Sequence, residues 1–140
     1  MKPIAINVNA DFRRAYGRGK NKADSVLVSY ALRTRRPVVR YGITTSKKIG
    51  SAVERNRCRR IIRAAYMQLL PELPRYGWDF VFVARGRTKE VKSTDVLRSM
   101  RGQLQALIST GAQNNTGAKR VGNGAYTRVK APEPNRSAGQ

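Results

Sequence analysis

The sequence predicts an α+β domain in which helices pack on one small sheet, with elements in the order α-β-β-α-β-α. Three patterns lead to this prediction: apolar residues alternate over 26–32, recur at helical spacing over 52–70, and form an almost unbroken run over 78–84. The long helix separates the last strand from the earlier two. One β-α-β crossover is therefore expected within an α+β sandwich.

The first predicted elements are a short helix and two strands. Asn9 suits a helix N-cap, Asp11 suits the first turn, and Gly17 suits the position after the last turn. The polar residues 18–24 are expected to form a loop. Strands over 26–32 and 38–46 flank a turn, and we expect them to pair as an antiparallel hairpin.

The second half of the domain is predicted to contain a long helix, a buried strand and a final helix. The long helix runs from about Ala52 to Leu70, where Pro71 and Pro74 end it. The run WDFVFVA over 78–84 is apolar enough for a strand buried on both faces. Ser93 begins the last helix, whose apolar stripe extends to Ile108.

The length of 140 residues allows one domain and a tail. Residues 1–8 are expected to be a flexible leader, and 9–108 a single α+β domain. Residues 109–140 are rich in Gly, Asn, Pro and charge, and we expect a disordered basic tail.

The charge balance indicates a nucleic-acid partner. The chain has 29 Lys and Arg against 8 Asp and Glu, a net charge of +21, which attracts polyanions. It has no histidine and one cysteine, Cys58, so histidine-based catalysis and multi-cysteine zinc sites are excluded. No apolar run suits a membrane span or a signal peptide, so a cytoplasmic protein is expected.

The long helix divides into an apolar face and a basic face. Cys58 lies on a core stripe with Ile61, Ile62, Ala65 and Leu69. The opposite face carries Asn56, Arg59, Arg60 and Arg63 without an acid. A solvated charged face is the alternative interpretation, but such faces usually mix signs, because like charges at this spacing repel. We therefore predict a contact with RNA phosphates.

Two aromatic residues on the first helix permit two interpretations. Phe12 and Tyr16 share one face, which either packs on the sheet or forms a platform for stacking bases. Arg13, Arg14 and Arg18 lie beside them, and Tyr30 and Tyr41 could extend such a platform.

The segment Thr45–Arg63 resembles the RNR signature of the bacterial ribonuclease P protein subunit. It has a Lys-Lys-x-Gly loop followed by Arg-Asn-Arg-x-Arg-Arg-x-x-Arg on a helix. Residues 9–16, 40–43 and 79–85 resemble three further blocks of that family, in the same order, so the resemblance covers about residues 9–108.

The resemblance implies a fold with a left-handed β-α-β crossover, which is rare. It also implies the protein subunit of a ribonucleoprotein endoribonuclease that removes the 5′ leader of precursor tRNA. The RNA and its magnesium would perform the chemistry, so that the protein supplies no catalytic group and binds no cofactor by itself. The implied partners are one catalytic RNA per protein and the precursor tRNA.

The resemblance assigns residues to the two RNA partners. The positions that match the family's contacts to the catalytic RNA are Lys47, Lys48, Arg55, Asn56, Arg57, Arg59, Arg60 and Arg63. Those that match its cleft for the 5′ leader are Phe12, Arg13, Tyr16 and Tyr30, with Ser29 replacing Tyr30 if the strand is aligned one residue differently.

Two other functions compete with this one. A ribosomal or RNA-assembly protein could share the basic α+β architecture, although the ordered blocks around the signature argue against it. A protein-only nuclease would need a catalytic group or a metal pair, and the eight carboxylates show no such pattern.

Overall fold

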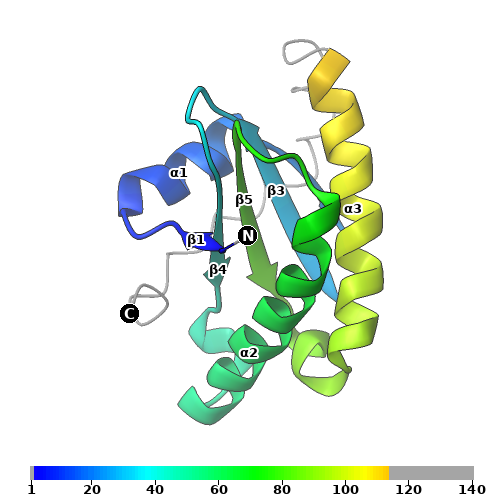
Figure 1. Ribbon diagram of the computed structural model, residues 1–140. Coiled ribbons are helices and arrows are strands. Elements are labelled where there is room, and N and C mark those ends of the chain that lie inside the picture. Colours follow the sequence, from blue (N-terminus) through cyan, green and yellow to red (C-terminus); the bar gives the residue numbers. More distant parts are fainter. Residues whose placement is uncertain (1, 114–140) are drawn as a thin grey trace.

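The structure is a computed structural model that describes residues 2–113, and the remainder of the predicted basic tail lies outside the described residues (Figure 1). The predicted α+β class is confirmed. The strands are β1 (Ile4–Ala5), β2 (Lys20–Ala23), β3 (Leu27–Arg33), β4 (Val39–Thr44) and β5 (Trp78–Ala84). The α-helices are α1 (Asn9–Arg18), α2 (Ala52–Leu69) and α3 (Ser93–Gln113), and the 3₁₀ helices are η1 (Lys47–Ile49), η2 (Leu70–Glu72) and η3 (Gly86–Glu90).

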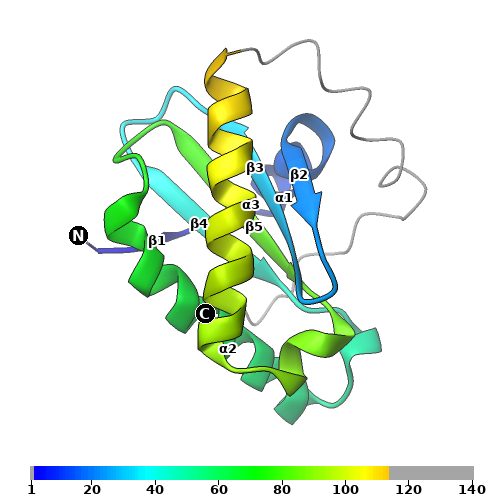
Figure 2. The same ribbon diagram turned by 90° about the vertical axis from the view of Figure 1, so that its right-hand side faces the viewer.

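The five strands form one mixed sheet in the order β1-β4-β5-β3-β2. The central strand β5 pairs parallel with β4 and antiparallel with β3. Helix α1 covers one face, and α2 and α3 cover the other, as Figures 1 and 2 show from two directions. The β4–α2–β5 connection is the predicted crossover, and its expected left hand stays a prediction.

The predicted hairpin is wrong, because β3 and β4 are not neighbours. Strand β5 lies between them, and its residues are buried on both sides except for the half-buried Val83. The alternating pattern of a strand indicates which side chains share a face, but it does not indicate which strand lies alongside.

Other boundaries also differ from expectation. The predicted loop contains β2, where Lys20 is paired with Ala31 of β3. The expected flexible leader contains β1, which pairs parallel with β4, and the buried Ile6 follows it. The predicted N-cap Asn9 is instead the first residue of α1, which follows Val8 without a side-chain cap. Gly17, predicted to follow the last turn, lies inside the helix, which continues to Arg18. Helix α3 extends to Gln113, five residues beyond 108.

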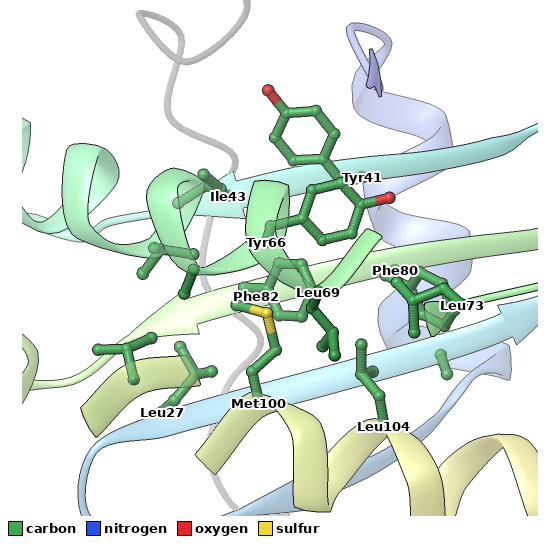
Figure 3. Packing of buried hydrophobic residues seen from close by; sticks show 14 of the residues in the cluster. Leu27, Tyr41, Ile43, Tyr66, Leu69, Leu73, Phe80, Phe82, Met100 and Leu104 are labelled. Carbon is green, nitrogen blue, oxygen red and sulfur yellow. The ribbon is translucent and has the colours of Figure 1, made fainter. Parts of the chain in front are cut away.

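The larger core lies between the sheet and the helices α2 and α3 (Figure 3). Tyr66 of α2 is fully buried and stacks on Tyr41 of β4, with ring centroids 4.6 Å apart. Met100 and Leu104 of α3 complete this layer and are also fully buried. Burial of one face of α2 in this core stabilises the helix and orients its opposite face toward solvent.

The smaller core holds α1 against the opposite face of the sheet. Phe12 and Ala15 pack there with Val28, Tyr30 and Val81, together with the buried Ile6. Gly42 of β4 allows this approach, since a Cβ atom at that position would lie 2.5 Å from the Phe12 ring. The close contact explains why a strand otherwise rich in large side chains contains glycine here.

A buried ion network joins the same helix to the sheet. Arg40 of β4 donates to both carboxylate oxygens of Asp79 on β5, at 2.9 and 2.6 Å. It donates a third bond, of 3.1 Å, to Asp11 of α1. Burial alone would raise the pKa of Asp11, but the bonds from Arg14 and Arg40 lower it overall. Helix α1 is therefore attached by both an aromatic contact and an ionised carboxylate.

Candidate RNA interface

The loop before α2 presents two lysines on a braced backbone. Ser51 and Glu54 form a capping box at the start of the helix. Lys89 of η3 reaches across to donate to the Ile49 carbonyl at 2.7 Å and lies 3.4 Å from the Glu54 carboxylate. The Ser51 amide and Lys89 together lower the pKa of Glu54. Lys47 and Lys48 of η1 therefore extend into solvent from a well-supported turn.

Three of the predicted RNA-binding arginines use donors within the protein. Arg55 donates to the Gly50 carbonyl at 2.9 Å, and Arg57 donates to the Lys89 carbonyl at 3.0 Å. Arg59 donates to the Thr45 hydroxyl at 2.9 Å and also contacts the Asn56 amide oxygen. These bonds support the loops around the start of α2, and each guanidinium keeps further donors for a ligand.

The other basic residues of the signature have no such partner. Within residues 2–113, the side chains of Arg60 and Arg63 make neither an ion pair nor a hydrogen bond, and both are exposed. They lie on α2 opposite Ile62, which is fully buried. The predicted division of this helix into a core face and a basic face is confirmed.

A pocket of about 330 Å³ opens between this basic face and the α1 side of the molecule. Helix α2 contributes Asn56, Arg59, Arg60 and Arg63 to its lining. The rest of the lining comes from the N-terminal segment, α1 and β4: Ala5, Ile6, Phe12, Tyr41, Gly42 and Ile43. The sequence placed Phe12 and the arginines in separate sites, whereas the structure brings them to one pocket.

The aromatic residues predicted to bind the leader are more buried than a stacking platform would be. Phe12 is 4% exposed and Tyr30 is 6% exposed. Tyr16 is half-buried, packs edge-on against Tyr30 at 5.1 Å, and shares a 2.6 Å hydrogen bond with the Thr44 hydroxyl. Burial raises its pKa to about 12, so the phenol is neutral at pH 7. Arg13 is exposed.

The structure also shows on which face of the sheet Ser29 and Tyr30 lie, the two alternatives for the leader contact on β3. Ser29 donates to Gln103 of α3 at 2.6 Å, so it lies on the face away from α1. Tyr30 lies on the α1 face, in the same cluster as Phe12. Only Tyr30 thus shares the face predicted for the leader.

The structure confirms the prediction that Cys58 is a core residue. It is fully buried in the larger core, and this burial raises the pKa of its thiol. A buried protonated thiol is a poor nucleophile, in agreement with a structural role.

Sequence reasoning missed Lys89 and Arg40. Lys89 lies 35 residues from the glutamate it contacts, and Arg40 lies 39 residues from Asp79. No local pattern distinguishes either of them from a surface cation. The position of Arg40 in an otherwise apolar strand was the one available signal.

The described residues hold no group of three or more His, Cys, Asp or Glu side chains arranged to bind a metal ion. None of the helices within residues 2–113 combines the length and the apolar character that a membrane span requires.

The fold has a mixed sheet, a helix α2 with an acid-free arginine stripe, and a well-supported lysine loop before that helix. These features define a small RNA-binding protein of the α+β class. The family model described as Ribonuclease P matches residues 2–108. The chain belongs to this family, and its role is that of the protein subunit of the ribonucleoprotein endoribonuclease ribonuclease P. The alternative of a ribosomal or RNA-assembly protein is not favoured.

Individual relatives agree with this assignment. The ribonuclease P protein component of Clostridioides difficile (strain 630) is 40% identical over 100 residues, which cover 71% of this chain and 88% of that protein. The component of Thermoanaerobacter sp. (strain X514) is 35% identical over 100 residues, covering 71% and 85%. The solved structure of the Staphylococcus aureus RNase P protein superposes with a TM-score of 0.65 at 30% identity, covering 75% and 95%.

Proposed function

We propose that this subunit holds two RNAs: the catalytic RNA through α2 and the η1 loop, and the 5′ leader of precursor tRNA through the α1 side of the sheet. The contacts to the catalytic RNA come from Lys47, Lys48, Arg55, Asn56, Arg57, Arg59, Arg60 and Arg63. Those to the leader come from Phe12, Arg13, Tyr16 and Tyr30. One protein serves one catalytic RNA, in the cytoplasm.

The observation that carries the proposal is the pair of unpartnered guanidinium groups at the pocket. Arg60 and Arg63 are repelled by neighbouring arginines and contact no carboxylate among the described residues. Phosphate oxygens accept forked hydrogen bonds from arginine and would relieve this repulsion. The surface is stabilised by the intramolecular hydrogen bonds of Arg55, Arg57 and Arg59. The remaining donors of these three side chains can bind RNA.

The leader contact rests on the solvent-facing parts of α1. Arg13 is exposed and suits a phosphate, and Tyr16 is half-buried. Phe12 and Tyr30 support that surface from the core, and Phe12 also reaches the pocket. The aromatic residues thus act mainly by fixing the shape of the cleft, with Tyr16 as the ring available to stack on a base.

In this proposal the magnesium needed for hydrolysis is held mainly by RNA. Most described carboxylates are already bonded: Asp11 and Asp79 to Arg40, Glu72 to Arg101, and Glu54 to the Ser51 amide. The protein's part is to offset phosphate repulsion and to hold substrate and catalytic RNA together.

The test is reconstitution with ribonuclease P RNA at low magnesium. Arg60→Ala with Arg63→Ala should weaken binding to the catalytic RNA by about 2–4 kcal/mol, at 1.5–3 for each charged hydrogen bond with incomplete additivity. Lys92→Gln with Arg98→Gln removes the same charge from the α3 side and is the matched control. Equal losses from both double variants would contradict a specific contact by α2.

Salt dependence supplies a second readout of the same contact. If four to six phosphates are neutralised, log K against log salt should slope at about −3 to −5, from roughly −0.7 to −0.9 per phosphate. A flat line would remove the electrostatic basis of the proposal.

Leader binding is tested by comparing precursor and mature tRNA with the holoenzyme. Tyr16→Ala should reduce affinity for precursor tRNA by about 1–3 kcal/mol if one base stacks there, and should leave mature tRNA unaffected. Equal losses for both substrates would argue against a leader contact on α1.

A further inference from the structure

A second group of arginines gathers far from the signature helix. Five of them line a pocket of about 400 Å³ between the C-terminal half of α1 and the segment from β3 to β4: Arg14, Arg18, Arg33, Arg35 and Arg36. We call this the arginine pocket. All five side chains belong to exposed residues, and the remaining lining is Leu32 and Thr34.

The backbone beneath the arginine pocket is held in place. The Thr34 amide donates to the Gly77 carbonyl at 2.8 Å, and the Gly77 amide donates to the Val38 carbonyl at 3.0 Å. Gly77 has a φ of +83°, a conformation that favours glycine. Arg33 lies over the Trp78 ring, with its guanidinium carbon 5.4 Å from the ring centroid. A loop that is hydrogen-bonded to the rest of the protein at both ends loses little conformational entropy when its arginines bind a ligand.

The charge of the arginine pocket is not balanced from within. Asp11 is the one carboxylate, among the described residues, found within ion-pair distance of any of the five. It lies 2.7 Å from Arg14 and 3.8 Å from Arg36, and it is also bonded to Arg40. The side chains of Arg18 and Arg35 have no ion-pair or hydrogen-bond partner within residues 2–113. Five positive charges thus face one buried carboxylate, so at least four charges of the arginine pocket are not neutralised by it.

The arginine pocket lies away from the lysine loop and α2, although Arg14 and Arg18 share α1 with the leader residues Arg13 and Tyr16. Strand β4 begins three residues after Arg36 of the arginine pocket and ends three residues before Lys47, so the pocket and the lysine loop lie at opposite ends of one strand (Figure 1). Six strand residues at about 3.3 Å each span roughly 20 Å. A single phosphate cannot contact both regions.

We propose that the arginine pocket binds the phosphodiester backbone of an RNA, as a contact separate from the signature helix. Arginine is the side chain whose planar fork fits phosphate oxygens, and two elements supply five such forks to one concave surface. An acidic peptide would supply carboxylates at a spacing that nothing in this fixed loop selects. The inference rests on the RNA-binding role proposed above and adds a second region of contact to it.

The catalytic RNA and the tRNA both have a phosphodiester backbone, so either could bind in the arginine pocket. The experiment distinguishes between them. Arg35→Gln with Arg36→Gln removes two charges from the loop, and Arg18→Gln removes one from α1. Binding is measured to the catalytic RNA alone, and to precursor and mature tRNA with the assembled holoenzyme. Lys92→Gln with Arg98→Gln on the α3 side is the charge-matched control, and circular dichroism with thermal unfolding verifies the fold.

The expected result for Arg35→Gln with Arg36→Gln is a fall in affinity on the order of tenfold near 0.1 M salt, with the slope of log K against log salt reduced in magnitude by about 1.4–1.8. Arg18→Gln should reduce the slope by about half as much. A loss seen with the catalytic RNA assigns the contact to that RNA. A loss seen only with the tRNAs assigns it to the substrate. Either result supports the proposal.

The proposal is overturned if folded Arg35→Gln with Arg36→Gln binds all three RNAs with the slope and affinity of the control. If Arg60→Ala with Arg63→Ala still loses binding in that case, the proposed function stands without the second contact. If neither double variant differs from the control, the proposed function fails as well.

Discussion

Helices α1 and α2 both carry residues predicted to bind RNA, but they are attached to the sheet in different ways. Helix α2 has 18 residues and packs through a full apolar stripe in the larger core, with Arg60 and Arg63 on its opposite side. Helix α1 has 10 residues, and its buried side chains are Asp11, Phe12 and Ala15. On α2 the binding and packing residues are different residues, whereas on α1 Phe12 has both assignments.

This difference determines whether a substitution on each helix can separate an effect on RNA binding from an effect on folding. On α2, loss of binding can be separated from loss of folding, because the basic residues contribute little to the core. On α1, a change at Asp11 or Phe12 alters the attachment of the helix itself. The following predictions therefore compare stability at the two helices, beginning with the largest expected loss.

Arg40→Ala should produce the largest loss, about 3–5 kcal/mol of unfolding free energy, because it leaves the Asp11 and Asp79 carboxylates without their shared buried cation. Urea unfolding measures the change. Arg101→Ala is the matched control, since Arg101 forms a similar two-bond pair with Glu72 at an exposed site and should cost less than about 1 kcal/mol. Equal losses would show that burial does not strengthen the network.

Phe12→Ala should cost about 3 kcal/mol, the lower end for buried aromatic residues, because the vacated volume adjoins an open pocket that water can enter. Thermal and urea unfolding measure the loss. Val53→Ala, at a position 76% exposed on α2, should change stability by less than about 0.5 kcal/mol. A stable Phe12→Ala protein that lost only precursor-tRNA affinity would instead favour the stacking platform.

The contrast between the helices also explains which features the sequence could predict. Helical periodicity separated Cys58 and Ile62 from Arg60 and Arg63, and the structure confirms that division. The same rule gave Phe12 and Tyr16 one face but could not say whether a sheet or a base would cover it. That depends on Gly42, which is far away in the sequence and allows α1 to approach.

Local sequence patterns also could not predict the order of the strands or the burial of the Arg40 side chain. Alternation in 26–32 identified a strand, yet it lies between β5 and β2 and does not pair with the next strand in sequence, β4. Two paired residues in β1 are too few to show any period. Arg40 resembled a surface cation because its two partners come from α1 and β5.

Asp11→Asn should cost about 1–2 kcal/mol near pH 7, since it removes the negative charge that Arg14 and Arg40 share and replaces one of the two acceptor oxygens with an amide donor. The Asp11 pKa in the folded protein lies below its ordinary value of 3.8. Its stabilising contribution is therefore complete above about pH 5 and is lost as the pH falls through the lowered pKa. Urea unfolding from pH 7 to pH 2.5 should show the two proteins converging in acid. Glu90→Gln, at an exposed site, is the control, and a constant difference at all pH values would contradict the role of the charge.

Arg60→Ala with Arg63→Ala should have the smallest effect on stability, within about 0.5 kcal/mol of the parent protein. Both side chains lie away from the larger core, and no described group depends on them for a bond. Alanine is the better helix former, and removing two cations from an acid-free stripe relieves repulsion, so the shift should be toward higher stability. Urea unfolding in low salt, where repulsion is least screened, gives the most sensitive measurement. A loss above 1 kcal/mol would mean that these arginines pack against the protein, and weaker RNA binding by this variant could then no longer be separated from a disturbed helix.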